Sequence, residues 1–391
     1  MSTLAAALLP AGLADVLPPA AAFEARTVER LMRHFAGFGY ERVKPPMIEF
    51  EETMLAGSAE ALAAETFRLM DPLAQRLLAL RPDMTMQVAR IASSRLAHRP
   101  RPLRLSYAGQ VVRVRGSQLH PERQFGQAGA EIVGSGAAAA DVEVIVMATS
   151  ALADLGVCGL TVDLGLPTLV PAMLAAAPVD AAAARRLRIA LDRKDASAIA
   201  AMAPVLGDDR ADMLARLAAS SGPAEGALAV LDGLDLPAAA AAERARLESV
   251  HERLHREVPA LTLTIDAAES RGFEYHTGVT YALFAESAAE EIGRGGRYQT
   301  QAGEAATGIT LFVDAVLRAL PRPRPEPRLL LPADTPPGLA QELRRHGWNT
   351  IDVLDPEPDP SAEAVRLDCT HLLVDGRPRP LPAVPRPAEK G

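Results

Sequence analysis

Cysteine is scarce in this sequence, and long apolar runs are absent. Its 391 residues include two cysteines, Cys158 and Cys369, and no CxxC motif, which excludes a disulfide framework and a cysteine-based zinc cluster. We expect both thiols to be reduced and buried in a cytoplasmic protein. No apolar run reaches the ~18 residues that a membrane-spanning helix needs. The start of the chain also lacks the basic segment of a signal peptide, so neither a membrane nor export is predicted.

Positive charge is in deficit as well. The sequence has 41 Lys and Arg against 49 Asp and Glu, a formal net charge of −8. A protein that grips a whole tRNA usually presents a basic face, because phosphate neutralisation supplies much of that affinity. The acidic balance therefore argues against nucleic acid, although it leaves room for a local basic patch. The histidines show no metal-ligand spacing, and we predict neither a metal nor a cofactor.

The length favours one large domain with appendages. We expect a body over 1–320, a proline-rich linker over 321–328, and a small α/β unit over 329–391 that ends in a disordered tail. An alanine-rich helical insertion is predicted near 170–258. Other helices are expected at 18–36, from 83–85 past 90, at 137–155, 311–320 and 338–346, and strands at 40–44, 66–70, 77–81, 104–115, 123–133, 160–164, 261–266, 279–285, 307–309, 329–331, 350–354 and 371–374.

Two of these strands, 104–115 and 123–133, carry polar side chains on one face. Period-two alternation puts Arg113 on one face of the first strand, and Gln127 and Glu131 on one face of the second. Such groups are costly to bury unpaired, so they line a polar cavity or pair with one another. The spacing alone leaves open a ligand pocket and an ion-pair network without a ligand.

A second polar region runs from Glu269 to Tyr298. It pairs Arg-Gly-aromatic-acid-Tyr at Arg271–Tyr275 with Arg-Gly-Gly-Arg-Tyr at Arg294–Tyr298. An arginine and tyrosine-bearing strands around a glycine pair suit a pocket that clamps a carboxylate and lets backbone approach a ligand closely.

These segments resemble the signature blocks of class II histidyl-tRNA synthetases. The resemblance rests on five blocks in the right order and covers about Leu9–Leu320. It includes YAGQVVRVRGSQLHPERQFGQAGAEIVG at Tyr107–Gly134, LALRPDMT at Leu78–Thr85, and the N-terminal segments GLADVLPP and FGYERVKPPMIE. It implies an α+β fold, a class II synthetase-like antiparallel sheet flanked by helices.

The resemblance also implies an amino-acid pocket. Its residues would be Asp83, Thr85, Gln127, Glu131 and Arg271, with Arg113 and Tyr275 nearby. Asp83, Thr85 and Gln127 would accept from an α-ammonium group, Arg271 and Arg113 would hold an α-carboxylate, and Glu131 would accept an imidazole N–H. Histidine is the favoured ligand, although the family's second tyrosine is His276 here.

The nucleotide side departs from the synthetase pattern. Arg-x-Glu becomes Arg113-Val114-Arg115, the basic loop becomes Gly116–Pro121, and the Glu-Arg pair of the third motif becomes Asp314-Ala315. The lost arginine would stabilise polyphosphate charge during adenylation, and loss of one such group typically costs about 10²–10³ in rate. The pattern indicates a kept pocket without the synthetase reaction.

A synthetase-like body without adenylation resembles the family of ATP phosphoribosyltransferase regulatory subunits. That resemblance implies a non-catalytic subunit that forms a hetero-oligomer with the short-form catalytic subunit and takes part in feedback inhibition of histidine biosynthesis by histidine. It also implies a homodimer, which we expect to form through 18–49. Whether histidine binds in the pocket or at a subunit interface stays open. The alternative is an active or divergent histidyl-tRNA synthetase-like ligase, which would need the arginine absent at Ala315 and a full anticodon-binding domain.

Overall fold

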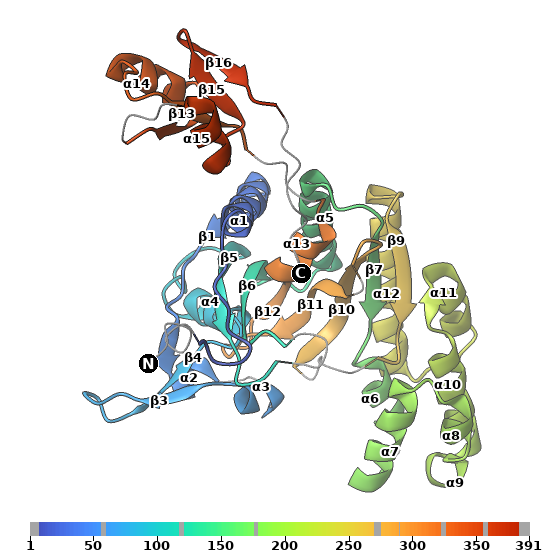
Figure 1. The fold of residues 1–391 in the computed structure, drawn as a ribbon. Helices are drawn as coiled ribbons and strands as arrows, with labels where there is room; N and C mark the ends of the chain where they lie inside the picture. Colours follow the sequence, from blue (N-terminus) through green and yellow to red (C-terminus); the bar gives the residue numbers. More distant parts are fainter. Residues whose placement is uncertain are drawn as a thin grey trace. The chain divides into compact units, whose positions relative to one another are not determined.

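The computed structural model describes residues 8–55, 60–116, 121–175, 179–269, 275–288, 290–321, 326–354 and 359–382. The chain divides into two compact units, Met1–Pro321 and Arg322–Gly391. Each unit has a sheet of its own (Figure 1). No helix within the described ranges is long and apolar enough to cross a membrane.

A nine-stranded sheet forms the centre of the first unit. Its order is β1-β5-β6-β12-β11-β10-β7-β9-β8, antiparallel except for the pairs β1–β5 and β7–β9. The strands are β1 (Glu41–Arg42), β5 (Leu103–Val112), β6 (Gln124–Val133), β7 (Leu160–Gly165), β8 (Gly222–Pro223), β9 (Thr262–Asp266), β10 (His276–Ala285), β11 (Glu291–Gln299) and β12 (Ala305–Phe312). The predicted class of fold, an antiparallel sheet flanked by helices, is confirmed.

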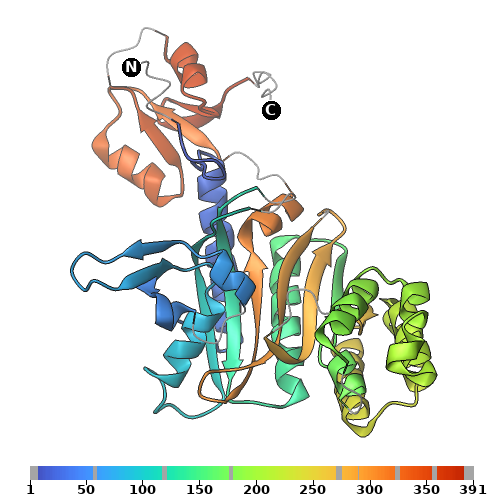
Figure 2. The same cartoon turned by 90° about the horizontal axis from the view of Figure 1, so that it is seen from below.

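Helices cover one face of this sheet, because alternate strand residues there are small or apolar. Ala128, Ala130 and Ile132 of β6 are buried in the largest hydrophobic cluster, on the face opposite to Gln127 and Glu131. The helices that pack there are α1 (Ala20–Gly37), α5 (Ala138–Leu155) and α13 (Val313–Ala319). Figure 2 shows α1 and α5 running along the sheet. This face is the core of the unit.

The other face carries α4 (Thr85–Ser93), whose residues join a second apolar cluster with Leu105, Tyr107 and Tyr298. Next to it lies a small sheet of order β2-β4-β3, with β2 (Ile48–Phe50), β3 (Arg68–Met70) and β4 (Leu77–Leu80). The short helices α2 (Glu51–Met54) and α3 (Glu60–Ala64) connect β2 to β3. The loop between β4 and α4 therefore reaches the polar face of the large sheet.

A helical insertion lies between β7 and β9. It comprises α6 (Leu169–Leu174), α7 (Ala181–Asp192), α8 (Ala196–Ala200), α9 (Ala203–Leu206), α10 (Asp208–Ala219), α11 (Ala224–Asp232) and α12 (Ala238–Glu257), with the two-residue β8 between α10 and α11. Asp180 caps α7 by accepting from the Ala183 amide at 2.7 Å, which satisfies a free N–H at the helix start. In Figure 1 these helices lie at the β9 side of the sheet.

The second unit has a four-stranded sheet of order β14-β13-β15-β16. Its elements are β13 (Arg328–Leu331), α14 (Pro337–Arg345), β14 (Asn349–Asp352), α15 (Pro360–Arg366), β15 (His371–Val374) and β16 (Arg377–Pro380). Leu329 and Leu331 pack with α14, whereas Leu330 packs with α15. The sequence pattern predicted α14 and the three strands β13, β14 and β15. It missed α15 and β16, because prolines at these positions are unusual in helices and strands.

Several local expectations were wrong. The strand predicted over 40–44 is paired only at Glu41–Arg42, and β5 ends at Val112, so Arg113 and Arg115 follow the strand rather than extend it. Residues 311–312, predicted as helix, complete β12. Cys369 is buried as expected, but Cys158 is exposed, and both are free. The predicted linker positions 322–325 and the tail from 383 lie outside the described residues.

Candidate functional site

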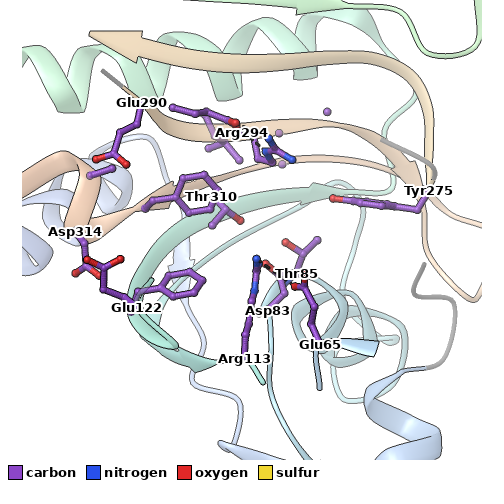
Figure 3. A pocket seen from close by; sticks show the side chains of 18 of the residues that line it. Glu65, Asp83, Thr85, Arg113, Glu122, Tyr275, Glu290, Arg294, Thr310 and Asp314 are labelled. Atoms are coloured by element: carbon purple, nitrogen blue, oxygen red, sulfur yellow. Dashed lines mark hydrogen bonds and ion pairs between the residues drawn. The ribbon is translucent and has the colours of Figure 1, made fainter. Parts of the chain in front are cut away.

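A cavity of about 400 Å³ opens on the polar face of the large sheet. Strands β6, β10, β11 and β12, the loop before α4 and the start of α13 surround it (Figure 3). It has two ends with different chemistry. One end is lined by Glu65, Asp83, Thr85, Glu131, Tyr275, His276 and Tyr298, and the other by Glu122, Glu290, Asp314, Ala315 and Arg318. Arg113, Arg294 and Thr310 lie between the two ends.

Glu131 is the centre of the first end. It is 1% exposed, and it accepts hydrogen bonds from the Tyr107 hydroxyl at 3.2 Å and the Tyr298 hydroxyl at 3.0 Å. The Tyr107 hydroxyl is also 2.8 Å from Thr310 Oγ1 and 3.2 Å from Thr85 Oγ1. Burial raises the pKa of Glu131 to about 8, and nearby hydroxyl donors oppose that shift. The result is a carboxyl group in a ring of hydroxyls.

Glycines on the neighbouring strands make room for this ring. A Cβ at Gly308 of β12 would overlap Glu131 Oε2, and a Cβ at Gly129 of β6 would overlap the Tyr107 ring. Gly308 lies opposite Glu131 in the β12–β6 ladder. Only a residue without a side chain lets the carboxyl group lie flat against the sheet here.

Asp83 forms the wall beside Glu131. Its Oδ1 accepts from the Thr85 amide at 2.8 Å, which fixes the start of α4, and its Oδ2 accepts from Gln127 Nε2 at 2.9 Å. Gln127 is 1% exposed, and its Oε1 has no hydrogen-bond partner among the described residues. The two hydrogen bonds from the Thr85 amide and from Gln127 fix the Asp83 carboxylate in place at the wall of the cavity.

Arg113 reaches the cavity from the end of β5. It lies 3.4 Å from Glu65 Oε2, donates to the Pro82 carbonyl at 3.3 Å, and stacks over the Phe125 ring with its guanidinium carbon 5.1 Å from the ring centroid. A guanidinium group held on three sides is a preorganised anion receptor. It lies between the two ends of the cavity.

The Arg-Gly-Gly-Arg-Tyr motif divides its two arginines between the faces of β11. Arg294 lines the cavity and pairs with Glu291, donating from Nε at 2.7 Å. Arg297 faces the helices instead, where it is 2% exposed and bonds Asp141 of α5 at 2.6 Å. Period-two alternation separates the two side chains, so Arg297 anchors the fold.

The far end of the cavity is acidic, and it contains the Asp314-Ala315 pair. Asp314 and Glu122 lie at this end (Figure 3), and Ala315 is 2% exposed. Burial, with Glu24 and Glu122 nearby, raises the pKa of Asp314 to about 6. Arg318 pairs with Glu290 at 2.5 Å. This end presents carboxylates to any phosphate group that enters.

Most residues that the sequence singles out meet at this cavity. Asp83, Thr85, Arg113, Glu131 and Tyr275 line it, while Gln127 lies behind Asp83. Arg271 lies outside the described residues. Their assignment to a histidine pocket stays a prediction. No group of His, Cys, Asp and Glu in the described ranges is arranged to hold a metal ion.

Sequence reasoning missed the hydroxyls of Tyr107 and Tyr298 as partners of Glu131. The signal was present for Tyr107, which period-two alternation puts on one face of β5 with Gly109 and Val111. It was also present for Tyr298, which shares one face of β11 with Gly296 and Arg294. It could not be used without the pairing of β11 to β12 and of β12 to β6, because that pairing brings the side chains together.

Comparison with known proteins identifies the family to which this chain belongs. The family model described as histidyl-tRNA synthetase matches residues 12–316. An ATP phosphoribosyltransferase regulatory subunit of Paramagnetospirillum magneticum is 57% identical, over 94% of this chain and 96% of that protein. One of Rhodospirillum centenum is 53% identical, over 95% of each. The chain belongs to the ATP phosphoribosyltransferase regulatory subunit family.

Solved structures agree with this family. An ATP phosphoribosyltransferase regulatory subunit/histidyl-tRNA synthetase from Bacillus halodurans C matches with a TM-score of 0.80 and 26% identity, over 93% of this chain and 97% of that chain. Histidyl-tRNA synthetase from Nostoc matches with a TM-score of 0.77 at 18% identity, over 94% and 91%, which is a likeness of fold. The regulatory subunits thus share the synthetase fold.

Proposed function

We propose that this chain is a non-catalytic regulatory subunit that binds and activates the short-form catalytic subunit of ATP phosphoribosyltransferase in the cytoplasm, and that histidine bound in its cavity transmits feedback inhibition. The observation that carries this proposal is the division of the cavity. At its proposed amino-acid end, Asp83 and Glu131 are held by hydrogen bonds. Its other end has Asp314 and Ala315 where the synthetase pattern has the adenylation groups. Two free cysteines fit a reducing compartment.

The amino-acid end suits histidine. Asp83 offers lone pairs to an α-ammonium group, Glu131 meets the ring, and Arg113, with Arg271, would hold the α-carboxylate. A zwitterion with an imidazole uses every one of these groups, whereas an aliphatic amino acid would leave Glu131 buried without a polar partner from the ligand.

The nucleotide end does not suit adenylation. A triphosphate would lie against Glu122 and Asp314, where like charge and poor solvation oppose it. Residue 315 is alanine, so its side chain cannot offset the charge of the transition state as an arginine at this position would. A protein that senses histidine is expected to lose adenylation and to keep the amino-acid end of the cavity.

Activation of the partner tests the proposal directly. The short-form catalytic subunit should co-purify with this chain and be much more active in the mixture than alone, and histidine should inhibit the mixture. A ligand shifts an assembly only if it binds one state better, typically by about 1–3 kcal/mol of coupling. A mixture that neither associates nor gains activity across salt and protein concentrations contradicts the regulatory role.

Histidine affinity tests the pocket separately. Glu131→Ala and Arg271→Ala should each weaken binding by about 2–5 kcal/mol, because each leaves a ligand group buried without its partner. Glu257→Ala, an exposed position at the end of α12, is the matched control. Unchanged affinity in both pocket variants would place the effector site elsewhere, at a subunit interface.

Pyrophosphate exchange tests the loss of catalysis. The purified chain should show no histidine-dependent exchange between ATP and pyrophosphate. Exchange with a turnover on the order of 1–10² per second, typical of enzymes, would favour a working ligase and remove the basis for a purely regulatory subunit.

A further inference from the structure

The hydrogen-bond partners of Glu131 are unusual for a buried carboxyl group. Every partner among the described residues is a neutral hydroxyl, with Tyr107 and Tyr298 donating directly. No arginine, lysine or histidine of the described ranges forms an ion pair with it. The other fully buried carboxyl, Asp141, pairs with Arg297 at 2.6 Å. Buried charges normally have such a partner, so Glu131 is built either to stay neutral or to meet a cation from outside.

The charged groups around Glu131 do not supply that cation. The carboxylate of Asp83, on the loop before α4, raises the pKa of Glu131 further, after the larger effect of burial. Tyr275, just before β10, and His276, the first residue of β10, line the cavity. Arg294 of β11 also lines it, but Arg294 is paired with Glu291. Strand β12 contributes the uncharged Thr310. An incoming ring nitrogen therefore meets a carboxyl group that forms no ion pair with any cationic side chain of the described ranges.

We propose that Glu131 and the imidazole ring of a bound histidine hold one proton between them, so that histidine affinity is greatest where exactly one of the two groups carries it in the free state. This inference rests on the proposed function, in which histidine occupies this cavity. It makes Glu131 the residue that selects a titratable ring over other planar side chains of similar size.

The proton balance follows from the two free groups. Free histidine loses its ring proton near pH 6.5, and the pKa of Glu131 is raised to about 8. Between these values the protonated carboxyl meets the neutral ring, and no proton is exchanged with solvent. Above pH 8 the carboxylate and neutral ring must take up one proton. Below pH 6.5 the protonated carboxyl and imidazolium must release one.

Calorimetry of the full-length chain with L-histidine measures this exchange. Titrations at pH 7.2 and pH 9, each in two buffers of different ionisation enthalpy, give affinity and proton uptake. We expect affinity about tenfold lower at pH 9 through Glu131, since one pH unit above its pKa leaves about a tenth of it protonated. The α-ammonium group of histidine also titrates on this side and adds to the loss.

Glu131→Gln separates the two contributions, because the amide keeps the shape, one donor and one acceptor but cannot titrate. At pH 9 the unaltered chain should take up about one proton more than Glu131→Gln. If that variant binds too weakly, Tyr298→Phe serves instead. It removes a donor to the ionised carboxyl, so the alkaline fall in affinity should move to higher pH.

Two outcomes contradict the inference in different ways. Equal proton uptake by the unaltered chain and Glu131→Gln, or an alkaline limb that Tyr298→Phe does not move, would overturn the shared proton and leave the histidine pocket standing. No histidine binding at any pH would overturn both the inference and the histidine part of the proposed function.

Discussion

Single residues show two ways in which this fold buries a carboxyl group. Asp141 pairs with Arg297, which opposes the rise in the pKa of Asp141 that burial causes. Arg297 also donates to the carbonyls of Ser135 at 2.8 Å and Ala137 at 2.9 Å. The partners of Glu131 within the described residues are hydroxyl groups, and burial raises its pKa to about 8. The first arrangement locks α5 to β11. The second leaves a group whose charge responds to a ligand, which is why one is structural and the other faces the cavity.

Removing one partner of the buried pair should be costly. Asp141→Ala leaves the Arg297 guanidinium buried and unbalanced, and we expect a loss of about 3–5 kcal/mol in the free energy of unfolding. Glu52→Ala, which breaks the exposed pair with Arg76, should cost less than about 1 kcal/mol. Urea unfolding of the three proteins gives the comparison, and equal losses would mean that the buried pair is not needed.

The pKa of Glu131 predicts how stability changes with pH. The folded state keeps this proton up to about pH 8, whereas the unfolded chain releases it near pH 4.3. The tighter binding of this proton in the folded state therefore stabilises the protein fully below the unfolded-state pKa. That stabilisation falls as pH rises and is gone once pH has passed through the folded-state pKa of about 8. Relative to Glu131→Gln, the unaltered protein should lose up to about 1.4 kcal/mol per pH unit between pH 5 and 7.5. Parallel urea-unfolding curves for the two proteins would contradict this.

At the scale of secondary-structure elements, strand pairing brings the residues of the site together. Strands β6, β11 and β12 lie side by side, so Glu131, Tyr298 and Thr310 meet although they are far apart in the sequence. The β4–α4 loop adds Asp83 from the small neighbouring sheet. The close approach of strand and carboxyl depends on glycine at Gly308, so the glycine-rich composition of these strands is a packing requirement.

Gly308→Ala should therefore disrupt the site and the sheet together. Its Cβ would overlap Glu131 Oε2 and crowd the Ala130 carbonyl, and overpacking of this kind costs about 1–3 kcal/mol or more. Gly226→Ala in α11 is the control, because no atom lies within 4 Å of its Cβ position, and alanine there should stabilise by about 0.5–1 kcal/mol. Thermal unfolding distinguishes them, and a neutral Gly308→Ala would refute the packing account.

At the scale of the whole molecule, each unit has its own core, and the first unit leaves apolar side chains uncovered. Near the predicted dimer segment, Leu17 is 67%, Phe38 37% and Ile48 42% exposed. Apolar groups that one chain does not cover are typical of an interface. The cavity and the family motifs all lie in this first unit.

We expect a homodimer through this region, since an isologous contact would bury these side chains on both copies. Phe38→Glu with Ile48→Glu should give a monomer by light scattering at micromolar concentration. Val205→Glu, at a 50% exposed position of the helical insertion, should leave the dimer unchanged. A stable monomer of the unaltered chain would contradict the prediction.

Removal of the second unit should leave these properties in place. A chain that ends at Pro321 keeps both the sheet with its cavity and the exposed apolar segment. We expect it to dimerise and to retain most of the activation of the catalytic subunit. Activation assays and light scattering on the truncated and full-length chains test this, and loss of activation with an intact dimer would assign the partner contact to the second unit.

The sequence by itself determined the class of fold, the order of most elements and the motif positions. Local periodicity and five ordered blocks carry that information, because alternation of side chains depends only on near neighbours. Strand ends were less certain, as at Val112, because pairing with distant residues decides where a ladder stops. The sequence also indicated that the arginine of the third synthetase motif is absent, because Asp314 and Ala315 occupy that position and residue type can be read directly.

Tertiary structure alone decided which polar groups meet. It placed Arg294 in the cavity and Arg297 in the core, put Gln127 behind Asp83, and surrounded Glu131 with hydroxyls from β5 and β11. These relations depend on strand order, which joins residues between 24 positions apart, as for Tyr107 and Glu131, and 167 positions apart, as for Tyr298 and Glu131. The charge of Glu131 depends in turn on burial and on its neighbours, and neither can be read from the residues beside it in the sequence.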